Sequence, residues 1–107
     1  MPTAQGSVRQ VGSASRIKAT FTVGDGREFY YDAVFTVPGT VPMFNSPIAL
    51  LTYATEGDLT GQQEFTGVLG PVTLAMTIGT ATTVAGPIDE NIDPPLPIKG
   101  RGSWTST

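Results

Sequence analysis

The sequence predicts an all-β domain, a small antiparallel barrel of six to eight strands, with a β-sandwich as the alternative. Apolar and polar residues alternate with period two over several short segments, which is the pattern of half-buried strands. The 13 glycines and 9 prolines divide these segments, and only 14% of residues are charged, against about 25% in an ordinary soluble domain. The barrel is preferred because glycines lie inside predicted strands, where tightly coiled barrels need kinks: Gly61, Gly67, Gly100 and Gly102.

The length of 107 residues predicts a single domain over residues 1–107, since a second independent core has no room. Hydrophobic residues make up 39% of the chain, which is enough to form one core. No apolar stretch approaches the roughly 18 residues that a membrane-spanning helix needs. The expectation is therefore one globular domain with no membrane span.

The clearest strands are residues 16–23 and 29–37. Their odd-numbered residues are apolar, and residues 24–27 between them suit a tight turn, so the two segments predict a β-hairpin. The opposite face carries Tyr30 and Val34, which makes it more apolar than contact with solvent alone requires.

The middle of the chain is less regular. Three prolines predict a loop over residues 38–47, with Phe44 closing one end of the barrel. Residues 48–55 suit a strand, although Ser46 and Pro47 also resemble the start of a short helix. A turn at residues 56–58 then leads to a strand over residues 59–69.

Three further segments complete the predicted sheet. Residues 72–79 read as a strand whose even positions are large and apolar and whose odd positions are small, so the odd face could pack closely against a second subunit. Residues 80–84 extend this strand or begin another, and residues 86–97 form an acidic, proline-rich loop. Residues 98–105 form the closing strand.

The chain contains no histidine and no cysteine. This composition excludes Ser-His-Asp and Cys-His catalysis, thiolate or imidazole metal sites and redox dithiols. Only carboxylates and tyrosines remain as acid-base groups, so the sequence favours a protein that is not an enzyme.

Two small sets of residues are candidate sites. Aromatic rings that stack on a sugar or a small molecule, with amide side chains beside them, give the predicted ligand-binding set: Tyr30, Phe44, Asn45, Tyr53 and Trp104. Asp89, Asn91 and Asp93 have the first, third and fifth spacing of a calcium loop. However, Pro94 replaces the required glycine and Gly100 replaces the closing glutamate, so the calcium site is weak and no other cofactor is expected.

Charge is unevenly distributed along the chain. Residues 1–31 carry a net charge of +2, residues 32–93 carry −7 with no cation, and residues 94–107 carry +2. This pattern predicts a cationic patch where the terminal strands meet, suited to an anionic ligand or an acidic partner surface. The net charge of −3 and the absence of an aromatic and basic motif argue against nucleic acid.

The sequence thus favours a non-catalytic binding or assembly module that forms a homo-oligomer. Its expected partner is a small-molecule or glycan ligand, or another protein, held by loops and exposed aromatic residues. One alternative is a barrel with an internal cavity that binds or cyclises a small apolar molecule. The other is a structural component of a virion or of a cell surface, favoured by the low charge and the glycine and proline content.

Overall fold

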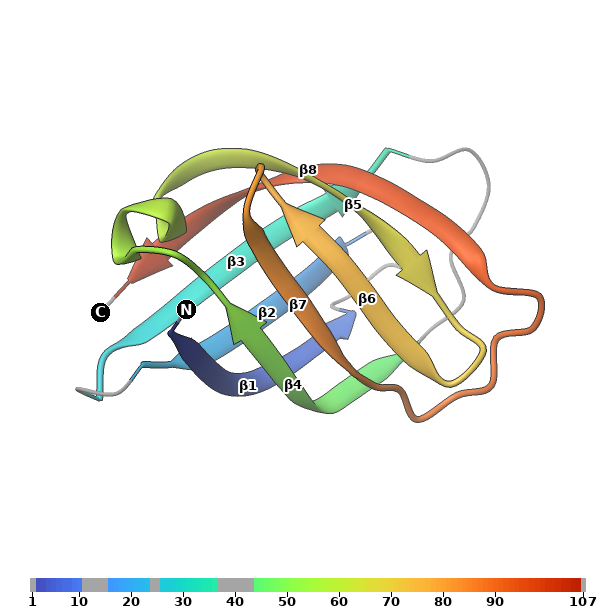
Figure 1. Cartoon of the computed structure of the whole chain (residues 1–107). Helices are drawn as coiled ribbons and strands as arrows, with labels where there is room; N and C mark the ends of the chain where they lie inside the picture. The colour runs from blue at the N-terminus through green and yellow to red at the C-terminus, as the bar shows by residue number, and fades with distance from the viewer. Residues whose placement is uncertain (1, 11–15, 24–25, 37–43, 107) are drawn as a thin grey trace.

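The chain folds into one closed antiparallel barrel of eight strands, which confirms the predicted fold class (Figure 1). The structure is a computed structural model and describes residues 2–10, 16–23, 26–36 and 44–106. Around the barrel the strands follow the order β1, β2, β3, β8, β5, β6, β7, β4, and β4 pairs with β1 to close it. The strands are β1 Thr3–Gln10, β2 Arg16–Thr22, β3 Glu28–Phe35, β4 Asn45–Thr52, β5 Gly61–Leu69, β6 Thr73–Ile78, β7 Thr82–Pro87 and β8 Leu96–Ser106.

The first predicted hairpin is present as β2 and β3. Phe21 pairs with Phe29, and the odd-numbered residues of both strands point into the barrel. Gly26, with φ of +89°, donates its backbone N–H to the Val23 carbonyl in the connecting turn, whose residues 24 and 25 lie outside the described part. The second strand ends at Phe35 rather than at residue 37.

Strand β1 was not predicted, and β4 begins earlier than the sequence suggests. Residues 45–47 of the predicted loop belong to β4, while residues 38–43 lie outside the described residues. The register between β1 and β4 shifts between Gly6 and Val8, so β4 has a bulge that contains Pro47. A bulge is one of the few places where a strand accommodates proline, because the ladder hydrogen bond is already missing there.

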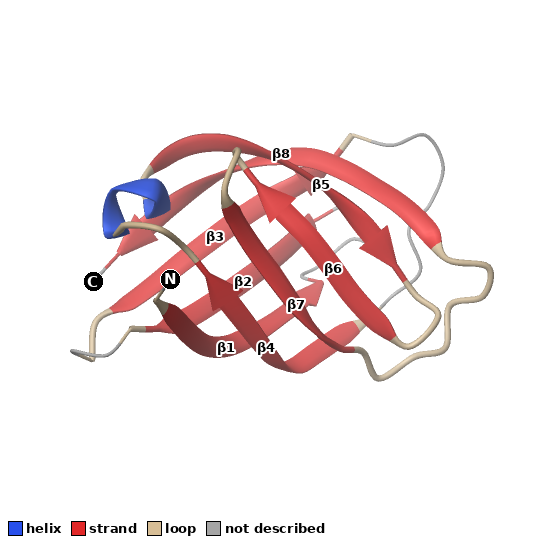
Figure 2. Ribbon diagram, in the orientation of Figure 1, coloured by secondary structure: helices blue, strands red, loops and turns tan. Residues whose placement is uncertain are grey.

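A short 3-10 helix, Glu56–Leu59, replaces the predicted turn and the start of the following strand (Figure 2). A capping box holds it, in which the Thr55 backbone N–H donates to the Asp58 carboxylate at 3.2 Å. Leu59 is buried, and the helix lies beside the end of β8, where it covers one end of the barrel. Strand β5 therefore starts at Gly61, whose φ of +73° favours glycine.

The remaining strands form a β6–β7 hairpin and a long β8. Residues 80–84 do not extend the preceding strand, since β7 begins at Thr82 and turns back along β6. The predicted loop 86–97 is shorter than expected, because β7 runs to Pro87 and β8 begins at Leu96. Strand β8 pairs with both β3 and β5 and so places the C-terminal segment between the two halves of the chain.

The barrel interior is filled by the protein's own side chains. Tyr31 lies at the centre, with its ring 5.0 Å from the Trp104 ring and 6.2 Å from the Phe65 ring. The Tyr31 hydroxyl donates to the Gln63 carbonyl at 2.7 Å, and burial raises the pKa of the phenol. The largest fully buried side chains are Tyr31, Phe21, Phe44, Phe65, Ile17, Leu51, Leu59, Leu69, Leu74, Ile78, Val8 and Val84.

Candidate functional site

Three of the five predicted ligand-binding residues lie in the core rather than at the surface. Phe44 is 1% exposed, and Tyr53 and Trp104 are each 5% exposed. Strand parity explains Trp104, because it pairs with Tyr31 and both side chains point into the barrel. Phe44 is packed in the core at the start of β4, where its backbone N–H donates to the buried Gln10 side chain at 2.6 Å. The structure therefore corrects the expectation that these aromatic rings are available to a ligand.

Tyr30 is the predicted aromatic residue that points outward. It is half-buried on β3, with the Lys18 ammonium 5.5 Å from its ring centroid. Its hydroxyl donates to the Glu28 carboxylate, and this bond raises the pKa of the phenol. The outer face of the Tyr30 ring is thus already covered by a cation.

Asn45 and the acidic loop contact each other. The Asn45 backbone N–H and side-chain amide donate to the Asp89 carboxylate at 2.8 and 3.3 Å, which lowers the pKa of Asp89. Ile92, between the three predicted calcium ligands, is buried, and its N–H donates to the Pro71 carbonyl at 2.8 Å. Within the described residues no cluster of three or more acidic side chains could hold a metal ion, so calcium at Asp89, Asn91 and Asp93 stays a prediction.

A surface that the sequence indicated only in part, through the small odd-numbered residues of 72–79, covers the outside of β4, β7, β6 and β5, which lie side by side in Figure 1. Strands β4, β6 and β7 contain no charged residue. The registers of β4, β7, β6 and β5 align one apolar residue from each of these strands in a row that continues onto β8. The row is Leu50, Ala85, Ala75, Val68 and Pro97, all exposed.

The neighbouring rows complete this surface, which we call the uncharged face. On one side a row of threonines crosses the same four strands: Thr52, Thr83, Thr77 and Thr66. On the other side lie Ile48, Val72, Thr73 and Pro87, of which Ile48 is 69% exposed and Val72 is 56% exposed. Threonine presents both a methyl group and a hydroxyl, so the face has mixed polarity without charge.

The opposite side of the barrel carries the positive charge. All six lysines and arginines lie on β1, β2, the β2–β3 turn and β8. The terminal strands do not meet as predicted, since β2 and β3 lie between β1 and β8, but the basic segments at the two ends of the chain lie on the same side of the barrel. Five of these side chains point outward from strands, and we call them the cationic band: Arg9, Arg16, Lys18, Lys99 and Arg101.

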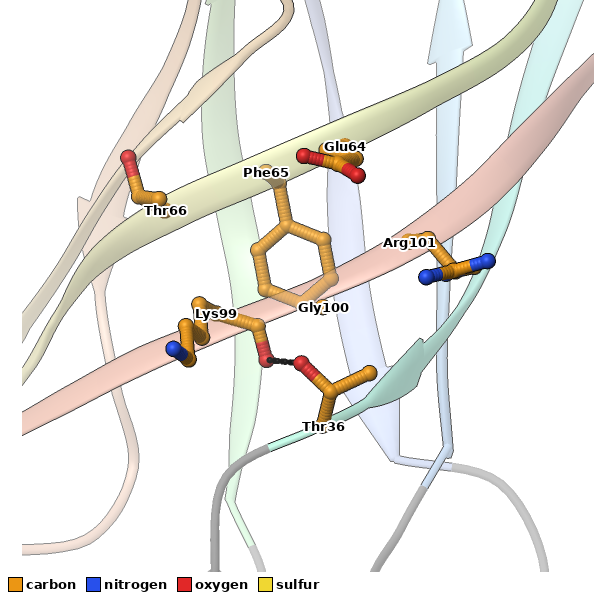
Figure 3. Close-up of a pocket in the computed structure, with 7 residues that line it drawn as sticks. All are labelled: Thr36, Glu64, Phe65, Thr66, Lys99, Gly100 and Arg101. Atoms are coloured by element: carbon orange, nitrogen blue, oxygen red, sulfur yellow. Dashed lines mark hydrogen bonds between the residues drawn. The ribbon is translucent and has the colours of Figure 1, made fainter.

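A shallow groove of about 210 Å³ lies within this side, between β5 and β8 (Figure 3). Lys99 and Arg101 flank Gly100 on β8, and Glu64 lies across from Arg101 on β5. The Thr36 hydroxyl donates to the Lys99 carbonyl at 3.5 Å at the lower rim. The groove therefore presents two cations, one carboxylate and hydroxyl groups over a small area.

One signal in the sequence does mark the uncharged face. Residues 33–55 and 65–88 contain no charged residue, and these two stretches supply β4, β6 and β7. Their outward residues come together only because β4 pairs with β7, a pairing that local patterns do not specify.

No helix in the described ranges is long and apolar enough to cross a bilayer. Comparisons with protein-family models, with curated proteins and with solved structures find no match to this chain.

Proposed function

We propose that this chain is a non-catalytic β-barrel module that acts by binding other molecules, and that it self-associates through the uncharged face. The observation that carries the proposal is the exposed apolar row across four neighbouring strands, three of which, β4, β7 and β6, contain no charged residue. Leu50 is 44% exposed and Val68 is 45% exposed, at the two sides of this row. Contiguous exposed apolar surface rimmed by polar residues is typical of interfaces, whose centres are depleted in charge.

The order of residues along the row supports packing against a flat surface. A barrel is convex, so the middle of any row stands out furthest. Here the middle positions are the small Ala85 and Ala75, and the larger Leu50 and Val68 lie on either side. The small residues in the middle offset the curvature and flatten the face.

A second copy of the chain is the partner that fits this face. An uncharged surface cannot attract a charged partner, whereas a second copy brings the same uncharged and flattened surface. A two-fold axis parallel to the strands would place Leu50 against the partner's Val68 and Ala85 against the partner's Ala75. The arrangement is closed, so a dimer is expected.

Sedimentation equilibrium over the micromolar range tests this proposal. The wild-type chain is expected to dimerise, and Val68→Glu is expected to raise the dissociation constant roughly tenfold or more, because the dimer would bury an unpaired carboxylate. Val34→Glu is the matched control, since Val34 is 43% exposed but lies on β3, away from the face. Wild-type protein that stays monomeric, or equal weakening by both variants, would contradict the proposal.

The structure argues against one of the two alternative functions, and the sedimentation experiment tests the other. Large buried side chains occupy the barrel interior, which counts against a hollow barrel that binds or cyclises an apolar molecule. A structural role in a virion or at a cell surface would need a contact that extends the assembly beyond a closed dimer. Species larger than a dimer in the same sedimentation experiment would favour that role.

A further inference from the structure

We propose that the cationic band binds an anionic polysaccharide and that the groove beside Arg101 receives one of its acidic groups. This inference rests on the proposal that the barrel is a binding module. It does not depend on self-association, because most of the uncharged face lies on β4, β7 and β6, which carry none of the cations, whereas β5 and β8 border both surfaces.

The strand registers bring the cations together. In one row, Arg9 lies opposite Lys18, which lies opposite Asp32. The next row crosses β2, β3, β8 and β5, and its members in that order are Arg16, Val34, Arg101 and Glu64. With Lys99 beside Arg101, the five cations face only two carboxylates in these rows, in a chain whose net charge is −3.

This arrangement costs stability. Like charges directly opposite each other on paired strands, such as Arg9 and Lys18, destabilise a sheet. The chain has few cations, and a placement that spread them over the barrel would avoid the repulsion. Local choices that oppose stability are expected where a surface has a binding role.

The groove is suited to a single acidic group. Its volume of about 210 Å³ is below the roughly 300–1,000 Å³ of pockets that enclose a whole small molecule. Lys99 and Arg101 lie two residues apart on one face of β8, about 7 Å along the strand. A Cβ atom at Gly100 would come within 2.8 Å of the buried Phe65 ring, so packing beneath the groove requires a glycine between these two cations.

The surroundings favour a polysaccharide over other anionic polymers. The closed barrel has no free strand edge to which an acidic peptide could add. Proteins that bind single-stranded nucleic acid stack its bases on exposed aromatic rings, whereas the Tyr30 ring on this side is half-buried with the Lys18 ammonium over it. Between the cations lie neutral groups suited to sugar hydroxyls: Thr20, Ser103 and Gln62.

Calorimetric titration tests the inference with four probes: heparin oligosaccharides, polygalacturonate oligomers, neutral dextran and single-stranded DNA. Binding of the sulfated or the carboxylated polysaccharide, weakened by added salt and absent with dextran, is expected. Binding of only one of the two identifies the acidic group. No binding of either polysaccharide, or DNA that binds as tightly, would overturn the inference.

Charge variants locate the binding. Arg101→Gln is expected to raise the dissociation constant for the polysaccharide roughly fivefold. Arg101→Lys keeps the charge and should raise it less. The double variant Lys99→Gln and Arg101→Gln should raise it more than Arg101→Gln alone. Arg27→Gln is the matched control, since it removes the same charge from the β2–β3 turn, outside the band. An equal effect of Arg27→Gln would overturn the placement. Leu50→Glu, which changes the same apolar row on β4 and away from β8, should leave polysaccharide binding unchanged, so loss of binding and loss of dimerisation are separate results.

Discussion

At the scale of single residues, two consecutive tyrosines show how strand parity separates structural from surface roles. Tyr31 points inward, packs against Trp104 and donates its hydroxyl to the Gln63 carbonyl. Tyr30 points outward and bonds Glu28 on its own strand. The first bond joins segments 32 residues apart in the chain, whereas the second is local, so only the first helps to hold the barrel together.

Tyr31→Phe is therefore expected to lower the free energy of unfolding by about 1 kcal/mol, because the partly buried Gln63 carbonyl loses its donor. Denaturation in urea at neutral pH measures this loss.

The raised pKa of Tyr31 also predicts that the stability of the wild-type protein depends on pH. The pKa of Tyr31 is raised from 10.0 in the folded protein, so the unfolded state releases its proton first and wild-type stability falls as pH rises above about 10.

Tyr30→Phe is the matched control for this prediction. The substitution is the same and the position is adjacent, yet the hydroxyl that it removes donates to Glu28 two residues away on the same strand. Its loss of stability at neutral pH should be clearly smaller. If both variants lose the same stability, the bond from Tyr31 to Gln63 has no special structural role.

At the scale of elements, glycines decide how closely the strands approach. A Cβ atom at Gly100 in β8 would strike the Val34 carbonyl and lie 2.8 Å from the Phe65 ring. At Gly57, in the 3-10 helix, the nearest atom to such a Cβ is the Thr55 hydroxyl at 3.5 Å, which is an ordinary contact. The sequence predicts a strand that runs through Gly100, because period-two alternation continues on both sides of it, and the structure confirms this strand as β8.

Gly100→Ala is expected to lower the free energy of unfolding by roughly 2 kcal/mol or more, since backbone and ring must both move. Gly57→Ala should change it by less than about 1 kcal/mol, because the added methyl group meets no close neighbour. Thermal and urea denaturation of the two variants compares them directly. A Gly100→Ala protein as stable as the wild type would show that β8 can shift away from β3 at little cost.

Other elements show where sequence reasoning failed. Strand β1 was missed because its alternation is broken by Gly6 and by the buried polar Gln10. The start of β4 was missed because Pro47 normally interrupts a strand and is tolerated here only at the bulge opposite β1. Among the predicted site residues, Tyr53 and Trp104 were placed at the surface because an aromatic residue gives no local sign of which face of a strand it occupies.

At the scale of the whole molecule, the fold depends on closure. Strand β1 lies between β2 and β4, and its pairing with β4 joins residues more than 35 positions apart. Without β1 the barrel would become an open sheet with two free edges, which would also expose core side chains such as Leu51. Open edges of this kind promote aggregation.

A chain that lacks residues 1–10 is therefore expected to lose cooperative unfolding, and a synthetic peptide of residues 1–10 is expected to restore it by pairing with β2 and β4. Val8 of this strand is fully buried, so the same peptide with Val8→Asp should fail because it would bring a carboxylate into the core. A peptide with Gln5→Asp is the control, since Gln5 is exposed. Circular dichroism during heating, with and without each peptide, measures the restored transition. Cooperative unfolding of the shortened chain alone would show that seven strands suffice and that closure by β1 is dispensable.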